Sequence, residues 1–332
     1  FGKACRRSPA LVKNPWRARF LNQTILRQLA PSSHGSTIHN HTHTMTQHTA
    51  PTLNLIGAGH LGRTLAHLWH IHSIYTVQAV HTRSTASAQA AVAEIGAGQA
   101  VAQLAHMPPA HVWLLAVPDG QISAAAHALA ALHHSPAIAW HASGYWSADL
   151  LAPLAAQGWH TASTHPAFSF AQVAQSVSQF PGTLCALEGD AIARTEAERA
   201  YHAIGAQCFT LAAAAKPLYH AAAVLASNFL PVLHAAASEL WQHAGVPAEY
   251  VPTLSNGFVQ RAAANLQALG SQAALTGPAA RGDTAVVQAQ TTALTAHDAT
   301  LGEAYAALSI LAARLAQHGT VTQSEDQDST PK

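Results

Sequence analysis

Charged side chains are scarce in this chain of 332 residues. They make up 9% of the sequence, well below the roughly one quarter that is usual in globular domains. Residues 1–44 hold seven Lys or Arg and no Asp or Glu, whereas the rest of the chain holds nine basic and 15 acidic side chains. A mildly acidic body lacks the basic face of a nucleic-acid-binding protein. The sequence therefore predicts no nucleic-acid partner.

Cysteine is almost as rare, with only Cys5, Cys185 and Cys208 in the chain. No two of them have the spacing of a metal site, and two cysteines in the body cannot build a disulfide framework. We therefore expect inert, reduced thiols in a cytoplasmic protein, and no metal. Long apolar runs are missing too: we find no stretch of the ~18 residues that a membrane span needs, so no membrane partner is expected.

The two ends of the chain differ in composition from its body. Residues 1–48 are first basic and then rich in Ser, Thr, His and Asn. We expect a disordered or non-native leader there, although an acid-free, Arg-rich segment also fits an organelle transit peptide. Its histidines fit a low-complexity tract better than a metal site. Residues 319–332 are polar and are expected to fray.

Between these ends, apolar runs and helical patterns alternate over residues 49–211. Strands are expected at 53–56, 77–80, 112–117, 137–140, 159–163, 182–187 and 207–211, and helices at 63–72, 86–95, 122–132 and 191–204. This alternation predicts the α/β class, with a Rossmann-like, doubly wound parallel sheet.

Strand patterns disappear over residues 212–318, which predicts an all-helical C-terminal domain. Four helices are expected, at 217–245, 249–269, 283–295 and 298–318. Pro231 is expected to kink the first of them, because proline cannot donate a helical hydrogen bond. Asn256-Gly257 is expected to break the second.

The first expected strand leads directly into the segment Gly57-Ala58-Gly59-His60-Leu61-Gly62. In a dinucleotide site, Gly57 would permit the tight turn, Gly59 the approach of a pyrophosphate, and Gly62 the packing of the helix on the strand. The helix that follows offers free N–H groups to phosphates. Strand, glycines and helix in this order predict a dinucleotide site, with His60 and Leu61 as further contacts in the same turn.

The residues after the second strand indicate which dinucleotide is bound. An NAD site places a carboxylate there, but this chain has His81-Thr82-Arg83-Ser84. A guanidinium forms paired, charge-assisted hydrogen bonds to a phosphate. Arg83 and Ser84 therefore favour NADP over NAD; the alternative is that Arg83 is only a surface charge.

Further polar or turn residues end later strands, where ligands bind in such sheets. Val117 and Pro118 are expected to lie along the cofactor. Asp119 after them is expected to cap a helix, and a role as an acid–base group is the alternative. Ser143 and His165 are candidate contacts to a substrate.

In the second domain, Lys216 is the only lysine between residues 14 and 331. At helical spacing His220, Ser227 and His234 fall on its face, with Asn228 on the flank. A lysine in a polar cleft can donate a proton to a substrate carbonyl as hydride arrives. We name Lys216, His220 and Asn228 as candidate catalytic residues; the alternative is a surface lysine with histidines that bind their neighbours.

A second polar element of this domain is the segment Thr276–Asp283. Arg281 within it is one of few cations available to an anionic substrate, and pairing with an acid across a dimer interface is the alternative. Asp283 is expected to cap the next helix.

These features resemble a poorly characterised family with an N-terminal NADP-binding Rossmann-like domain and a helical C-terminal domain of unknown function. The family is similar to pyrroline-5-carboxylate reductase, ketopantoate reductase and deazaflavin-dependent NADP oxidoreductase. The resemblance spans about residues 53–316 and is carried by Gly57–Gly62, Val117–Asp119, His141–Gly144, His165-Pro166, Lys216–Pro231 and Thr276–Asp283. It implies an NADP-dependent oxidoreductase that reduces a small carbonyl or imine between its domains, and a possible homodimer.

Two departures from related enzymes leave an alternative open. In the 3-hydroxyisobutyrate-type dehydrogenases an Asn follows the catalytic Lys by four residues, whereas His220 stands at that distance from Lys216. In ketopantoate reductase a downstream Asn acts with the Lys, but the spacing of Asn228 does not match. The alternative is an NADP-binding protein without turnover, such as a sensor or an assembly factor.

Overall fold

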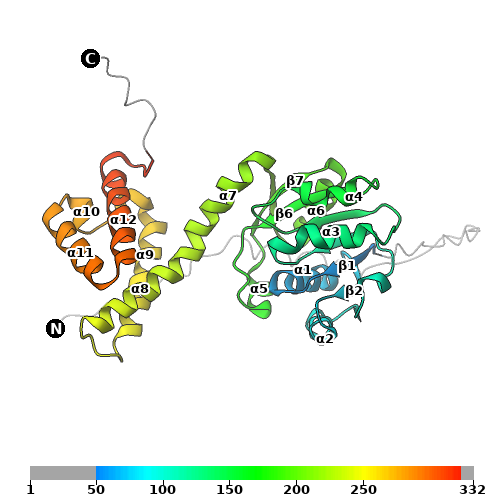
Figure 1. Ribbon diagram of the computed structural model, residues 1–332, viewed down its shortest axis with the longest axis horizontal. Coiled ribbons are helices and arrows are strands. Elements are labelled where there is room, and N and C mark those ends of the chain that lie inside the picture. Colours follow the sequence, from blue (N-terminus) through cyan, green and yellow to red (C-terminus); the bar gives the residue numbers. More distant parts are fainter. Residues whose placement is uncertain (1–49, 323–332) are drawn as a thin grey trace, which may run out of the picture. The chain divides into compact units, whose positions relative to one another are not determined.

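The computed structural model describes residues 50–322, which form a twisted sheet covered by helices and a separate group of helices (Figure 1). The leader expected at 1–48 and most of the tail expected at 319–332 lie outside the described residues. The sheet has eight strands in the order β3-β2-β1-β4-β5-β6-β7-β8. The strands are β1 (Thr52–Ile56), β2 (Thr76–His81), β3 (Gln99–Val101), β4 (Val112–Leu115), β5 (Ile138–His141), β6 (His160–Pro166), β7 (Leu184–Gly189) and β8 (Gln207–Thr210).

The sheet is doubly wound and mostly parallel, as predicted. The exception is the pair β6 and β7, which run antiparallel. Pro166 at the end of β6 pairs with Cys185 near the start of β7, so the chain turns back at that edge without crossing the sheet. The expected doubly wound parallel sheet is thus present, with this one antiparallel pair inside it. Strand β3 was not predicted, because three residues are too few to show a pattern.

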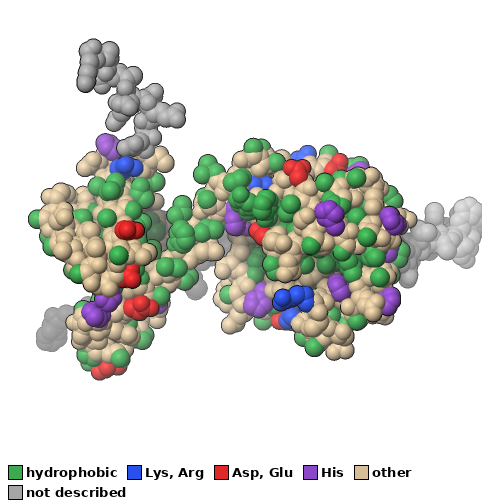
Figure 2. Space-filling view, in the orientation of Figure 1, with side chains coloured by type: hydrophobic (Ala, Val, Ile, Leu, Met, Phe, Trp, Pro, Cys, Tyr) green, Lys and Arg blue, Asp and Glu red, His purple; other side chains and the backbone are tan. Residues whose placement is uncertain are grey.

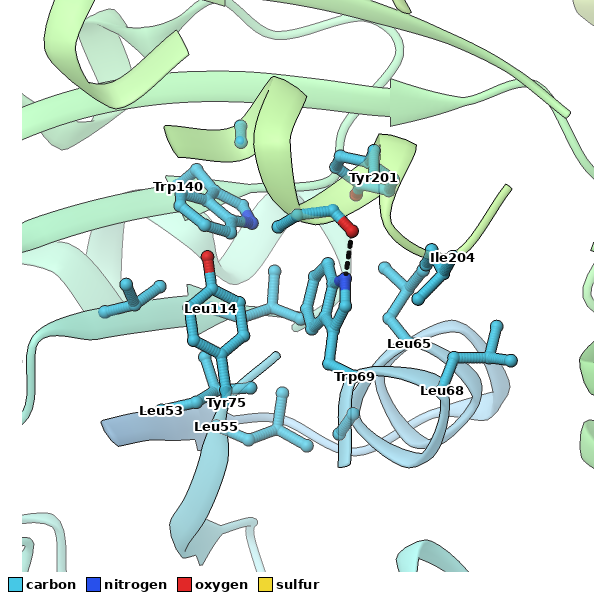
Figure 3. Packing of buried hydrophobic residues seen from close by; sticks show 14 of the residues in the cluster. Leu53, Leu55, Leu65, Leu68, Trp69, Tyr75, Leu114, Trp140, Tyr201 and Ile204 are labelled. Atoms are coloured by element: carbon cyan, nitrogen blue, oxygen red, sulfur yellow. Dashed lines mark hydrogen bonds between the residues drawn. The ribbon is translucent and has the colours of Figure 1, made fainter. Parts of the chain in front are cut away.

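Helices cover both faces of the sheet. One face is covered by α1 (His60–Ile71), α2 (Thr85–Ile95) and α6 (Ala191–His202), and the other by α3 (Ile122–Ala130) and α4 (Ala152–Ala155). On the first face the core centres on Trp69, whose ring packs edge-on against Tyr75, Trp140 and Tyr201 (Figure 3). Its indole N–H donates to the Ala200 carbonyl over 3.0 Å, which ties α1 to α6.

A long helix follows β8, and its irregularity has a local cause. It consists of α7 (Lys216–Ala223), a π-helical turn (Val224–Asn228) and α8 (Phe229–His243). Pro231 has no N–H to donate to the carbonyl four residues back. The π turn directly before it accommodates this missing bond, close to where the sequence predicted a kink.

The remaining helices are α9 (Val251–Ala274), α10 (Pro278–Arg281), α11 (Thr284–His297) and α12 (Ala299–His318). The break expected at Asn256-Gly257 is wrong: α9 runs through it and departs from helical geometry at Gly270 instead. Just before that dipeptide, the buried Ser255 hydroxyl bonds the Val251 carbonyl and Ser238 of α8. Packing on α8 thus outweighs the local preference of Asn-Gly for a turn.

One segment contradicts the expectation that no run reaches membrane length. Ala213–His243, 31 residues long, is long and apolar enough to cross a membrane, by length and composition alone. Ser227, Asn228 and His234 hid the run in the sequence, because they divide it into shorter apolar pieces. No residue of its most apolar stretch is buried within the described chain, and Leu218 is 80% exposed. Figure 2 shows hydrophobic side chains along this helix at the surface.

Candidate functional site

A groove with a volume of about 630 Å³ lies at the carboxyl ends of β1 and β4. Two of the predicted glycines, Gly57 and Gly59, line it. Gly57 has a φ of 82°, and a Cβ there would meet the Ala116 carbonyl. A Cβ on Gly62 would meet the Ala116 side chain, whereas one on Gly59 would point into open space. Gly57 and Gly62 therefore serve the close approach of strand and helix, and Gly59 leaves the groove open for a ligand.

Arg83 is exposed and lines the same groove, as Thr82 and Ser87 do. Ser84 does not line it, because its hydroxyl accepts the Ser87 N–H at the start of α2. A second guanidinium, that of Arg63, also lines the groove and pairs with Glu94 at 2.8 Å. The sequence reasoning missed Arg63, because a basic residue on an expected helix carries no special pattern.

The other predicted cofactor residues divide into two groups. Val117 and Pro118 line the groove. The ring of His60 instead lies 3.0 Å from the Phe170 carbonyl, and Leu61 packs against the hydrophobic core. His60 and Leu61 thus hold the turn in place from behind the groove.

The loop after β4 and the loop after β5 are joined by Asp119 and Ser143. The Ser143 hydroxyl donates to the Asp119 carboxylate over 3.0 Å and accepts the Tyr145 and Trp146 N–H groups. The prediction that Asp119 caps a helix is wrong, because its carboxylate makes no capping bond there. Ser143 is buried, so its side chain shapes the loop.

His141 is a buried, neutral member of the same loop. Its Nδ1 accepts the Ser143 N–H over 3.2 Å, which places the ring proton on Nε2, 2.9 Å from the Ser147 carbonyl. Burial lowers the pKa of His141 to about 4, against a weaker upward effect of the bond to Ser147. The ring therefore links Ser143 to Ser147 and holds the loop between them in place.

Lys216 reaches this loop from the first turn of α7. Its ammonium donates to the Ser143 carbonyl over 3.0 Å and to the Ser163 hydroxyl over 2.9 Å, and the side chain is 1% exposed. Burial lowers the pKa of Lys216, opposed by the nearby carboxylates of Glu188 and Asp119. The structure therefore places Lys216 beneath the loop and in contact with β6.

His165 and His220 come together at the end of β6. Their rings lie edge to face with centroids 5.6 Å apart, and Nδ1 of His165 lies 3.0 Å from the Tyr219 hydroxyl. A Cβ on Gly144 would collide with both imidazoles. Burial, with smaller effects of His220 and Lys216, lowers the pKa of His165 to about 4. His165 is therefore a neutral imidazole that packs against the backbone of Gly144, which has no side chain.

Two predicted site residues lie away from this cluster. Asn228 is twelve residues along the helix from Lys216, a rise of about 18 Å, and its side-chain oxygen accepts the Ser227 hydroxyl proton. Arg281 is exposed and pairs with Asp283 at 2.9 Å. Asp283 stands at the expected cap position of α11 but makes no capping bond, since its carboxylate binds Arg281.

Within residues 50–322, no group of three His, Cys, Asp or Glu side chains is arranged to hold a metal ion. Ser163, Tyr219 and Gly144 belong to the cluster but were not predicted. In the sequence Tyr219 and Gly144 stand next to predicted site residues and Ser163 stands two residues before His165. Only the folded chain brings their partners close.

Comparison with known proteins gives two family matches. A Rossmann-like domain matches residues 39–166, and Domain of unknown function (DUF2520) matches residues 183–311. The resemblance inferred from the sequence is thereby confirmed, as is the fold class. The second match begins before β7, inside the sheet, and not at the change from strands to helices expected at residue 212. No curated protein matches the sequence.

Several solved structures are similar. A Bacteroides fragilis protein described as a candidate NADP oxidoreductase is 21% identical, with a TM-score of 0.66 over 80% of this chain and 99% of that one. A Thermotoga maritima protein is 25% identical, with a TM-score of 0.60 over 79% and 98%. Pyrroline-5-carboxylate reductase from Coxiella burnetii is 14% identical, with a TM-score of 0.50 over 78% and 97%. At these identities the likeness establishes the fold.

Proposed function

We propose that this protein is an NADP-dependent oxidoreductase that reduces a small carbonyl or imine compound. The observation that carries the proposal is the pairing of an open glycine cradle with a buried polar cluster at the same edge of one sheet. Gly57 and Gly59 form the cradle, and Ser143, His165 and Lys216 belong to the cluster. The named activities of similar structures, such as an NADP oxidoreductase, support the same class.

The groove fits a nicotinamide dinucleotide with a 2′-phosphate. Gly59 has open space where a side chain would stand, and the N-terminus of α1 faces phosphates in such sites. Arg83 is exposed in the groove near the end of β2, where the 2′-phosphate would lie. Val117 and Pro118 would border the ribose. The cofactor, when bound, supplies the hydride.

The chain's own residues suit the proton side of the reaction. Burial raises the pKa of Tyr219, which keeps its hydroxyl proton and donates it to Nδ1 of His165. The imidazole proton of His165 is then on Nε2, which faces the bare backbone of Gly144. A neutral imidazole there can donate a hydrogen bond to a substrate oxygen or nitrogen.

Lys216 is assigned a positioning role in this proposal. Direct proton donation to a substrate, the role that the sequence predicted, would require the ammonium to leave Ser143 and Ser163. Held where it is, the ammonium fixes the loop beside His165. His220 packs edge to face against the imidazole, while Asn228 and Arg281 have no role in this arrangement.

The second candidate is an NADP-binding protein without turnover. It is favoured by one observation: the ammonium of Lys216 is already engaged by two partners and is 1% exposed. A sensor or assembly factor would bind NADP in the groove without turnover. The loop that contains Ser143 would then only respond to whether the cofactor is bound.

Two measurements on the full chain test these proposals. Fluorescence titration is expected to show binding of NADPH that is tighter than binding of NADH. Absence of binding by either cofactor at millimolar concentration would reject both candidates. A screen of small aldehydes, ketones and cyclic imines, followed by NADPH absorbance, separates them: consumption supports the oxidoreductase, and binding without consumption across the screen supports the sensor.

We also propose a homodimer built on the apolar helix. Leu218, Leu225 and Val232 are exposed along it, and exposed Phe258 on α9 and Ile310 on α12 add further apolar surface. Ser227, Asn228 and His234 interrupt the run with polar groups that a lipid interior would penalise, so a second copy is the occupant we favour. Light scattering after size exclusion is expected to give twice the chain mass; a monomer, or recovery with membranes, would contradict this.

A further inference from the structure

Cys185 and Cys208 are direct register partners on the neighbouring parallel strands β7 and β8. Adjacent strands lie about 4.8 Å apart, within the Cα separation of roughly 4.4–6.8 Å at which a disulfide can form. Both side chains point to the face covered by α6: Cys185 lies in the core cluster with Tyr201, and Cys208 packs against that cluster. The two thiols therefore meet on one side of the sheet.

The two thiols differ sharply in access. Cys185 is 0% exposed. Cys208 is half-buried and lines a surface pocket of about 290 Å³ together with Arg194, Glu198 and Thr210. A small polar reagent in this pocket can reach the sulfur of Cys208 and cannot reach that of Cys185.

Their acidities differ in the same direction. A hydrogen bond from the Cys185 thiol lowers the pKa of Cys208, against an opposing effect of its partial burial. Burial raises the pKa of Cys185 well above its ordinary value. Since the thiolate is the nucleophile, Cys208 is the sulfur that reacts first and Cys185 stays protonated beside it.

We propose that Cys208 is a peroxide-reactive thiol that is resolved by Cys185 into a β7–β8 disulfide. The Cys208 thiolate attacks one oxygen of hydrogen peroxide, the O–O bond breaks, and hydroxide leaves to give a sulfenic acid. The Cys185 sulfur then bonds to the Cys208 sulfur, and the sulfenic oxygen leaves as water with the Cys185 proton. Two thiols are oxidised by two electrons in all, and the peroxide is reduced.

The bridge would act next to the candidate site, although the proposal does not depend on the proposed function. Cys185 pairs with Pro166 on β6, and the neighbouring residue His165 pairs with Ala186. Strand β8 ends at Thr210 and leads within six residues to Lys216. A disulfide would tie the edge strand β8 to the strand that supports His165.

The test uses the full chain with Cys5→Ser, so that only the two strand thiols remain. The chain is treated with hydrogen peroxide, unfolded in guanidinium chloride and then alkylated. Both thiols are expected to become resistant to alkylation together, with a mass loss of two hydrogen atoms and one crosslinked peptide. Dithiothreitol is expected to reverse all three changes. Two thiols that stay open to alkylation, or Cys208 oxidised alone to a sulfinic acid, would overturn the proposal.

Two further variants assign the order of events. In Cys185→Ser the sulfenic acid on Cys208 has no resolving thiol and is expected to be trapped by dimedone. In Cys208→Ser no peroxide-dependent change is expected at Cys185, and modification of Cys185 there would contradict the assigned roles. Should either variant fail to fold, the peptide map of the Cys5→Ser chain still decides whether the bridge forms.

Discussion

The Ser143 hydroxyl donates to the Asp119 carboxylate over 3.0 Å, and this bond joins the loop that borders the groove to the loop that holds the polar cluster. Pro118, next to Asp119, lines the groove, and Ser143 is held from below by Lys216. Occupancy of the groove and the shape of the cluster are thus connected by one side-chain pair.

Ser143→Ala is expected to lower the free energy of unfolding by about 1–3 kcal/mol, because the part-buried Tyr145 and Trp146 amides lose their acceptor. Urea denaturation followed by circular dichroism measures the change. Ser135→Ala, at an exposed position, is the matched control and should be nearly neutral. Equal stability of the two variants would refute the assigned role of the Ser143 hydroxyl.

Arg83→Ala is expected to weaken NADPH binding by about 10- to 100-fold, the loss of charge-assisted bonds worth roughly 1.5–3 kcal/mol. Binding of NADH should change little, because it has no 2′-phosphate. Fluorescence titration with both cofactors gives the ratio. Arg199→Ala removes a guanidinium that pairs with Glu196 instead and should leave the ratio unaltered. An equal loss of affinity for NADPH and NADH would mean that Arg83 does not bind the 2′-phosphate.

The elements that form the groove could be predicted from the sequence, because their sequence patterns are local. The strand before Gly57, the turn and the helix after Gly62 stand next to one another in the chain. Arg83 follows β2 directly and faces the groove as expected.

The rest depended on pairing across the fold, which local patterns do not encode. The register between β7 and β8 sets Cys185 opposite Cys208, so two thiols expected to be inert became neighbours. Asp119 met Ser143 rather than capping a helix. For Lys216 the helical pattern indicated a polar face, whereas its burial depends on bonds to Ser143 and Ser163 in distant parts of the chain.

The stability of the protein is expected to fall as the pH drops from about 6.5 toward 4. His141 and His165 have pKa values lowered to about 4 by burial, whereas in the unfolded chain they titrate near 6.5. Between these values the unfolded state binds more protons, so the neutral rings stabilise the fold above pH 6.5 and this stability is lost toward pH 4. The slope of the free energy of unfolding against pH measures this loss of stability.

A variant pair isolates that dependence. His141→Asn should flatten the slope between pH 7 and pH 5, even where it lowers stability at pH 7. His72→Asn, at an exposed position, should retain it. A slope in His141→Asn as steep as in the unaltered chain would assign the pH dependence to other groups.

Trp69→Phe is expected to cost about 1–3 kcal/mol of unfolding free energy, because the buried Ala200 carbonyl loses its donor and the core loses volume. Trp69→Ala should cost about 3–5 kcal/mol. Trp146→Phe, at a residue 41% exposed, provides the control and should stay close to neutral in the same urea experiment. A small effect of Trp69→Ala would show that the core around α1 and α6 repacks freely.

Lys216→Met removes a buried ammonium that bonds the Ser143 carbonyl and the Ser163 hydroxyl. The carboxylates of Glu188 and Asp119 then lose their nearby cation, and loss of one partner from a buried charge cluster costs on the order of 3 kcal/mol. Arg314→Met, on α12, is the control and should cost much less. For any substrate found in the screen, the positioning role predicts a lower kcat with an unshifted pH profile. Loss of one limb of that profile in Lys216→Met would instead make Lys216 the proton donor and return His165 to a supporting role.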